Sequence, residues 1–162
     1  MRTTLLAAAA LLASASTAFA EPASVQVTIG PELQAKAEKT YGVRDVQRLA
    51  DSLRRDVEKA LARTGAHADA RVDLVLVDAV PNRPTFKQLS DRPGLSLESF
   101  GIGGAKIEGQ ITAADGAVTP VSYRWYESDI RQAYGAWVWS DAEWTFDRFA
   151  HRLGRGQLVA RR

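Results

Sequence analysis

The chain has 162 residues, of which 46% are hydrophobic and 25% charged, a composition that suits one globular domain and is too polar for a multi-span membrane protein. Its 21 basic and 19 acidic residues leave a formal net charge of +2, so the totals do not indicate the basic surface of a nucleic-acid-binding protein. The sequence contains no cysteine. We therefore expect no disulfide, no thiol chemistry and no cysteine-linked lipid anchor.

The first twenty residues have the pattern of a cleavable secretory signal peptide. Arg2 provides a positive start, residues 5–12 are an unbroken apolar run, and residues 18–20 form the small-x-small site Ala-Phe-Ala. The run is shorter than the roughly 20 residues that a membrane span requires. We expect cleavage after residue 20, no membrane span, and a soluble protein located in the periplasm or, alternatively, secreted.

The first half of the remaining chain has the pattern of a β-α-β unit. Polar and apolar side chains alternate over residues 24–29, which predicts a half-buried strand. Helix-forming residues over 31–40 predict a short helix, and apolar residues at three- and four-residue spacing over 44–63 predict a long one. Residues 71–79 are apolar on both faces, which predicts a central strand buried on both sides.

The long predicted helix has a clear end and a charged surface. Gly65 stands where a helix C-cap favours a left-handed residue. Asp51 with Arg55 and Arg54 with Glu58 are four positions apart and can form ion pairs. This pattern is typical of a solvated helix face, and we prefer that interpretation to a nucleic-acid-binding face.

A β-hairpin is predicted over residues 104–126. Two alternating runs flank residues 114–116, Ala-Asp-Gly, whose glycine suits the left-handed third position of a three-residue hairpin loop. The register that puts all apolar side chains on one face also places Lys106 opposite Arg124. This like-charge pair is unfavourable unless Glu108 reaches Arg124 on the diagonal.

The last predicted helix completes a single α+β domain over residues 21–154. Ser140 and Glu143 have capping-box spacing ahead of an apolar run that ends at Gly154. Residues 155–162 are predicted to form a basic flexible tail. The predicted architecture is one small sheet, made of the β-α-β unit followed by the hairpin, with two main helices packed on one face.

The segment 80–103 is the candidate binding site, because it lacks clear periodicity and is longer than most connections in a compact domain. Aromatic residues concentrated between positions 123 and 144 could add a stacking platform. The alternative is a packed loop that covers the sheet, with about half of the aromatic rings in the core. The candidate binding residues are Asn82, Arg83, Thr85, Phe86, Ser96, Ser99, Tyr126 and Trp144.

No catalytic residue, metal ligand or cofactor is predicted. The chain lacks the Gly-x-Ser-x-Gly motif, and its two histidines, His67 and His151, are 84 positions apart without the spacing of a zinc site. The glycines over 101–104 lead into a predicted strand, whereas a phosphate-binding loop leads into a helix. The sequence therefore leaves enzymatic activity undecided and favours its absence.

The C-terminal half resembles a group of uncharacterised envelope proteins and lipoproteins of Gram-negative bacteria. The shared features are a Gly-Gly-Ala strand at 103–105 followed by Ile-Glu at 107–108, and an Asp-Gly turn at 115–116. They continue with Trp-Ser-Asp-Ala at 139–142 and Phe-Ala-x-x-Leu at 149–153. The resemblance covers only part of the chain and implies a small envelope-associated α/β domain without an assigned activity. Because the shared motifs are structural, it assigns no functional residue.

Together these features favour an exported protein that binds a ligand or assists envelope assembly without catalysis. The expected partner is an envelope protein or a glycan, and no nucleic acid. The alternative is a small exported hydrolase acting on an envelope polymer. That alternative requires Arg83, Ser96 and Ser99 to converge in a pocket within hydrogen-bond reach of a histidine or a carboxylate.

Overall fold

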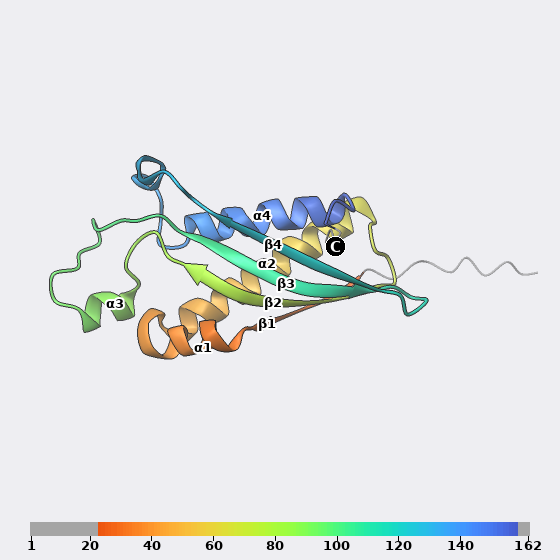
Figure 1. Ribbon diagram of the computed structural model, residues 1–162, viewed down its shortest axis with the longest axis horizontal. Helices are drawn as coiled ribbons and strands as arrows, with labels where there is room; N and C mark the ends of the chain where they lie inside the picture. Colours follow the sequence, from red (N-terminus) through yellow and green to blue (C-terminus); the bar gives the residue numbers. More distant parts are fainter. Residues whose placement is uncertain (1–22, 159–162) are drawn as a thin grey trace, which may run out of the picture.

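The computed structural model describes residues 23–158, so the predicted signal peptide and residues 159–162 of the predicted tail lie outside the described residues. Figure 1 shows a twisted sheet with two long helices lying across it. The strands, in spatial order, are β1 (Ser24–Ile29), β2 (Arg71–Val80), β3 (Gly104–Thr112) and β4 (Val118–Tyr126). β1 is parallel to β2, and the other neighbouring pairs are antiparallel.

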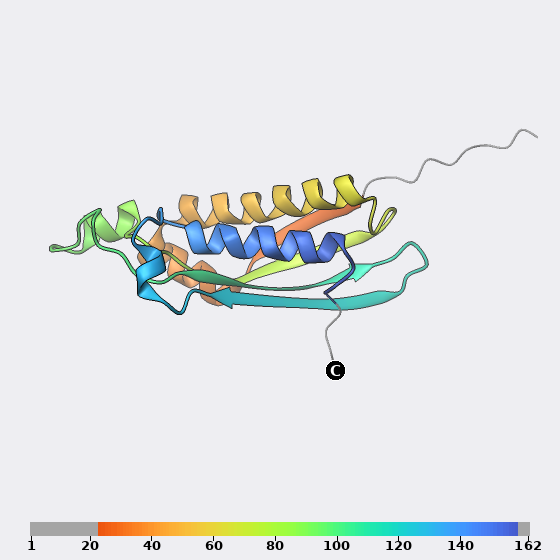
Figure 2. The same cartoon turned by 90° about the horizontal axis from the view of Figure 1, so that it is seen from above.

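Two long helices cover one face of the sheet. After β1 the chain forms α1 (Pro31–Lys36), the π-helical turn η1 (Ala37–Tyr41) and α2 (Val43–Thr64). After β4 it forms the 3-10 turn η2 (Ile130–Ala133) and α4 (Ser140–Gly154). Figure 2 shows α2 and α4 side by side in one layer and the sheet in the other. The predicted α+β fold, a β-α-β unit followed by a hairpin, is confirmed.

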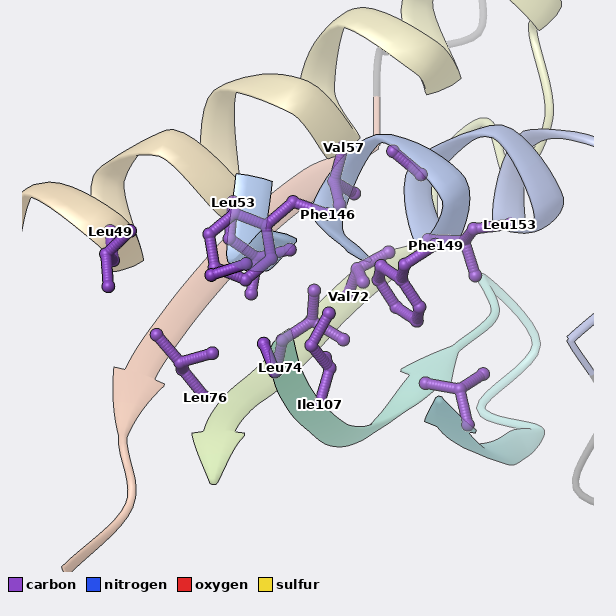
Figure 3. Packing of buried hydrophobic residues seen from close by; sticks show 14 of the residues in the cluster. Leu49, Leu53, Val57, Val72, Leu74, Leu76, Ile107, Phe146, Phe149 and Leu153 are labelled. Atoms are coloured by element: carbon purple, nitrogen blue, oxygen red, sulfur yellow. The ribbon is translucent and has the colours of Figure 1, made fainter. Parts of the chain in front are cut away.

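The hydrophobic core lies between the two helices and the covered face of the sheet. Phe146 and Phe149 of α4 are fully buried in one cluster with Leu53 of α2 and Ile107 of β3 (Figure 3). Complete burial of side chains of this size stabilises the fold by about 1.5–3 kcal/mol each. The opposite face of the sheet presents alternating polar side chains to solvent, as predicted for the hairpin.

The long helix α2 ends as predicted but forms only one of the two predicted ion pairs. Gly65 adopts φ +68° and its N–H donates to the carbonyl of Leu61, which makes it a left-handed C-cap. Arg54 Nη1 lies 2.9 Å from Glu58 Oε1. Among the ion pairs of the described residues there is none between Asp51 and Arg55, so that expectation was wrong.

The hairpin of β3 and β4 has the predicted register. Ala113 donates to Ala117 across the turn, and Lys106 pairs directly with Arg124. The like-charge pair is relieved in a different way from the one expected. Glu108 lies on the same strand as Lys106 and forms an ion pair with it at 2.8 Å, which neutralises one of the two charges.

The prediction that β2 is buried on both faces was wrong. β2 has a neighbour on each side, as a central strand does, but Val75 and Val77 on its uncovered face are only half-buried. A β-bulge after Leu76 lets Asp78 pair with Lys106. This extra residue returns Ala79 to the covered face, where it is fully buried. In the sequence, Val75, Val77 and Ala79 therefore look like a second apolar face, although the bulge puts Ala79 on the covered face.

The capping box predicted at Ser140 is absent. The N-cap of α4 is Trp139 and it makes no side-chain capping bond, whereas Ser140 Oγ accepts a hydrogen bond from Trp137 N at 2.8 Å. Ser140 thus fixes the turn before the helix instead of the first turn of the helix. Beyond α4 the chain turns back, and Leu158 packs against the core.

Candidate functional site

Two connections that are far apart in the sequence meet at one end of the sheet. Residues 81–103 join β2 to β3, and residues 127–139 join β4 to α4. Figure 1 shows both at the same end of the strands, with 81–103 extending past the sheet and not across it. We call these two connections the loop end. Six of the predicted binding residues belong to it, namely Asn82, Arg83, Thr85, Phe86, Ser96 and Ser99.

Asn82 holds the two connections together from a buried position. Its Nδ2 donates to Asp141 Oδ2 at 2.6 Å and to the carbonyl of Gly101 at 3.2 Å, and its Oδ1 accepts from Asp141 N at 2.9 Å. Its backbone N–H donates to the carbonyl of Val138 at 2.7 Å. The polar groups of Asn82 are thus directed to the protein itself. Asp141 completes the arrangement by accepting from Gly103 N at 2.8 Å.

Arg83 has a similar role on the outside of the loop end. Its guanidinium donates to three backbone carbonyls, those of Ala136 at 2.5 Å, Tyr134 at 2.7 Å and Leu97 at 2.9 Å. Phe100 lies under the guanidinium with 6.0 Å to the ring centroid and packs edge-on against Tyr134. Arg83 therefore positions both connections, because a planar donor group with several N–H groups can satisfy carbonyls from two segments at once.

Thr85 and Phe86 start a helix that was not predicted from the sequence. In α3 (Phe86–Asp91), Thr85 Oγ1 accepts from Gln88 N and Gln88 Oε1 accepts from Thr85 N, which is a complete capping box. The Thr-x-x-Gln spacing was the signal in the sequence. The helix leaves Phe86 80% exposed at its first position. Thr85 is thus a structural residue, whereas Phe86 is available to a ligand.

Ser96 and Ser99 lie near Arg83 but do not form a catalytic arrangement with it. Ser99 Oγ accepts from Ser96 N, and Ser96 Oγ accepts from Glu98 N, so both hydroxyls stabilise the local turn. Within residues 23–158 no histidine or carboxylate side chain hydrogen-bonds any of the three residues. The same range contains no group of three or more potential ligand side chains that could hold a metal ion.

Tyr126 and Trp144, the other two predicted binding residues, lie outside the loop end, on β4 and α4. Tyr126 crosses from β4 over Gly104 and donates to Asp78 Oδ2 at 2.8 Å, while Lys36 Nζ binds Asp78 Oδ1 at 2.7 Å. Burial, and then the hydrogen bond to Asp78, raise the pKa of Tyr126, so its hydroxyl stays protonated as a donor. Trp144 is exposed on α4, as its position relative to Phe146 predicts.

A groove runs between α2, α3 and the start of α4, and two of the predicted binding residues, Thr85 and Phe86, line it. Its volume is about 410 Å³. Its apolar lining comes from three separate segments, and Phe86 and Leu97, exposed by 80% and 62%, stand at its side. The apolar lining residues are Leu49, Pro84, Phe86, Leu89, Leu97, Val138 and Trp139.

Charged side chains border this groove. Arg48 and Asp45 form an ion pair with each other, and Arg55 and Glu143 add one charge of each sign. Burial, and then the neighbouring Asp56, raise the pKa of the Glu143 carboxyl. A ligand that brings a positive group to Glu143 would favour its ionised form.

Exposed apolar side chains are concentrated around the loop end. Ten large hydrophobic residues are exposed in the described part of the chain, and eight of them belong to the loop end or to the first turns of α4. Exposed apolar side chains gathered at one end of a soluble protein are a feature of interaction sites. These eight residues are Phe86, Leu97, Phe100, Ile102, Ile130, Tyr134, Trp137 and Trp144.

A second, wider depression of about 720 Å³ lies on the uncovered face of the sheet. It is lined mainly by polar strand residues, such as Thr28, Asp73 and Gln110, and by none of the predicted binding residues. The groove at the loop end is therefore the better candidate for a ligand site, because it combines apolar lining with exposed apolar neighbours.

Comparison with known proteins gives little guidance. No protein-family model matches the chain, and no curated protein matches it. The chain is similar to the crystal structure of a minor lipoprotein from Acinetobacter baumannii, with a TM-score of 0.35 and 12% sequence identity, over 85% of this chain and 94% of that chain. Similarity at this level assigns neither a family nor a function. None of the helices within residues 23–158 combines the length and apolar character that crossing a membrane requires.

Proposed function

We propose that the protein is a non-catalytic binding module of the bacterial envelope, exported to the periplasm, and that the groove at the loop end holds an apolar segment of a partner protein. The observation that carries this proposal is the groove itself, with Phe86 and Leu97 exposed beside an apolar lining. The predicted signal peptide and the resemblance to envelope proteins support the location.

The chemistry of the groove favours a protein segment over a glycan. Phe86 and Trp139 also line the groove, but Leu49, Leu89 and Val138 add aliphatic surface, which suits apolar side chains better than sugar hydroxyls. Large apolar side chains of a partner would be removed from water there, at a gain of about 25 cal/mol per Å² of buried apolar surface. The bordering charges of Arg55 and Glu143 would then select the orientation of the bound segment.

Photocrosslinking in the native envelope tests this proposal. A photoreactive amino acid placed at position 86 or 97 should capture one discrete partner protein, because both side chains stand at the groove. The matched control is position 118, since Val118 is 55% exposed but lies in β4 at the far end of the sheet from the groove. Capture of the same species from all three positions, or from none, would refute the proposed site.

A binding assay with purified protein should follow once the partner is captured. Phe86→Ser and Leu97→Ser should each weaken binding, and Val118→Ser should leave it unchanged. Arg83→Ala is a poor probe for this purpose, because it releases three backbone carbonyls and so changes the shape of the loop end as well. Equal affinity of the Phe86→Ser, Leu97→Ser and wild-type proteins would contradict the assignment of the groove.

A further inference from the structure

The outer edge of β1 carries no charge and, in residues 23–158, pairs with no other strand. Its sequence Ser-Val-Gln-Val-Thr-Ile contains neither a charged residue nor a proline, and its only strand neighbour is β2. The side chains of Val25, Val27 and Ile29 face the core but are only partly buried. A strand edge of this composition is a template for pairing with another strand.

The hydrogen-bonding groups of this edge belong to the same residues that face the core. Ser24 N donates to Ala70 O at 3.0 Å and Gly30 N donates to Leu76 O at 2.9 Å, so even-numbered positions are bonded to β2. Backbone polar groups along a strand point alternately to its two sides. The N–H and C=O groups of Val25, Val27 and Ile29 therefore point to the outer edge.

The opposite edge of the sheet is protected. Pro120 in β4 has no N–H to donate, and Arg124 places a charge on that strand. On the other face of β4, the guanidinium groups of Arg148 and Arg152 from α4 lie over Trp125 and Tyr123, at 4.3 and 5.2 Å from the ring centroids. The β1 edge lacks such features, so it is the edge of this sheet that is open to pairing with another strand.

We propose that two copies of this protein associate through antiparallel pairing of their β1 strands, centred on Val27, so that two four-stranded sheets form one continuous sheet. In this register Val27 pairs with Val27 of the second copy, and Val25 pairs with its Ile29. Each paired residue offers both its N–H and its C=O, so each pair exchanges two hydrogen bonds. A shift by one residue would pair core-facing with solvent-facing side chains and lose this match.

The helix layer also continues across this interface. Four strands about 4.8 Å apart are roughly as wide as two helices of about 10 Å diameter. α2 packs against β1, so a second copy would bring its own α2 alongside at about the distance at which helices pack. The side chains of the second α2 would then cover the parts of Val25, Val27 and Ile29 that are exposed in a single copy.

The flank of α2 that would meet its symmetry mate carries charges of both signs. Asp56 faces α4. Arg54 and Glu58 are each two residues from Asp56, which is about 160° around the helix, so both lie on the side of α2 that faces away from α4. A two-fold axis brings this flank against an identical one in the opposite direction. Arg54 and Glu58 form an ion pair within each copy at 2.9 Å, so the axis would bring two such pairs together with opposite charges able to face each other, which a flank of one charge could not do.

Charged substitutions on the edge test the proposal without disturbing the core. Gln26 and Thr28 face solvent, and in the proposed register each lies opposite the other of the second copy. The mature wild-type protein should sediment as a dimer at high concentration. Gln26→Lys combined with Thr28→Lys should abolish the dimer, because lysines would face each other across the interface. Ser122→Lys, an exposed position of β4, should leave the dimer intact.

A cysteine crosslink tests the register separately. The chain has no cysteine, so Val27→Cys introduces a single thiol, and mild oxidation should yield a covalent dimer through the two-fold axis. Val118→Cys, on the protected edge, should stay uncrosslinked. A wild-type protein that remains monomeric at its solubility limit would overturn the proposal. So would a dimer that survives the paired lysines while circular dichroism shows an unchanged fold.

Discussion

Asn82 and Asp141 are 59 positions apart, yet two hydrogen bonds join them where the loop end meets α4. Asn82 Nδ2 and Gly103 N both donate to Asp141 Oδ2, while Asp141 N donates to Asn82 Oδ1. Both residues are almost fully buried. A buried carboxylate of this kind is stabilised only as long as its donors are present.

We therefore expect Asn82→Ala to lower the free energy of unfolding by about 1–3 kcal/mol, because it removes one donor from a buried carboxylate and leaves the Asp141 N–H without its acceptor. Urea denaturation measures this change. Ser122→Ala, at an exposed position, is the control and should alter the stability little. Equal stability of Asn82→Ala and wild type would mean that water replaces the amide at no cost.

Gly104 shows a second constraint at the residue scale. It adopts φ +149°, and a Cβ there would lie 2.3 Å from Trp125 O and 2.6 Å from Tyr126 Cα. The ring of Tyr126, whose hydroxyl donates to Asp78, also lies close, with its Cδ1 2.7 Å from the same Cβ position. Gly104→Ala should cost about 3 kcal/mol in thermal or chemical unfolding. Gly135→Ala, with nothing within 4 Å of its Cβ position, should cost far less, and a similar loss in both variants would contradict this account.

At the scale of elements, the sequence predicted the hairpin best. Its register followed from two independent signals, the alternation of apolar residues and the glycine of a three-residue turn, and both select the pairing of Ala113 with Ala117. The end of α2 was equally predictable, since a left-handed glycine is a local feature. Elements specified by neighbouring residues could thus be read from the sequence.

Three other features could not be read from the sequence, for different physical reasons. α3 has six residues, too few for helical periodicity to be visible, and only the spacing of Thr85 and Gln88 indicated it. Ser140 had capping-box spacing, but its hydroxyl is taken by Trp137 N. The groove was not predicted, because Leu49, Phe86 and Val138 come from three segments that no local pattern connects.

The contact between α2 and α4 provides a pH-dependent prediction. Asp56 of α2 and Asp147 of α4 line one small cleft between the helices. Burial, and then the charge of Asp147, raise the pKa of Asp56, although Arg55 and Lys59 partly oppose this. A raised pKa means that the folded state binds the proton more tightly than the unfolded state does. The free energy of unfolding should therefore fall as pH rises from the ordinary value of 3.8 through the raised pKa.

Asp56→Asn removes this ionisation and should reduce that fall, so the variant should be more stable than wild type at neutral pH. Chemical denaturation at a series of pH values measures it. Asp51→Asn is the matched control, because it removes the same charge from α2 outside this cleft. A neutral-pH stability of Asp56→Asn below that of wild type would show that the carboxylate is favourably placed.

At the scale of the whole molecule, the groups that hold the fold and those available to a ligand are separate. The core cluster lies between the sheet and the two long helices, whereas most exposed apolar side chains gather at the loop end. Asn82, Arg83 and Thr85 keep that end in shape through hydrogen bonds to backbone and buried groups. Phe86 and Leu97 contribute little to the core and stand free beside the groove.

This separation predicts different outcomes for two phenylalanines. Phe146→Ala should lower the free energy of unfolding by about 3–5 kcal/mol, because the side chain is 0% exposed and its loss leaves a cavity among Leu53 and its neighbours. Phe86→Ser should change it by no more than about 0.5 kcal/mol, since the ring is already in water. Parallel urea titrations of the two variants measure both values. If Phe86→Ser were also strongly destabilising, the ring would belong to the fold, and its exposure would no longer argue for a ligand.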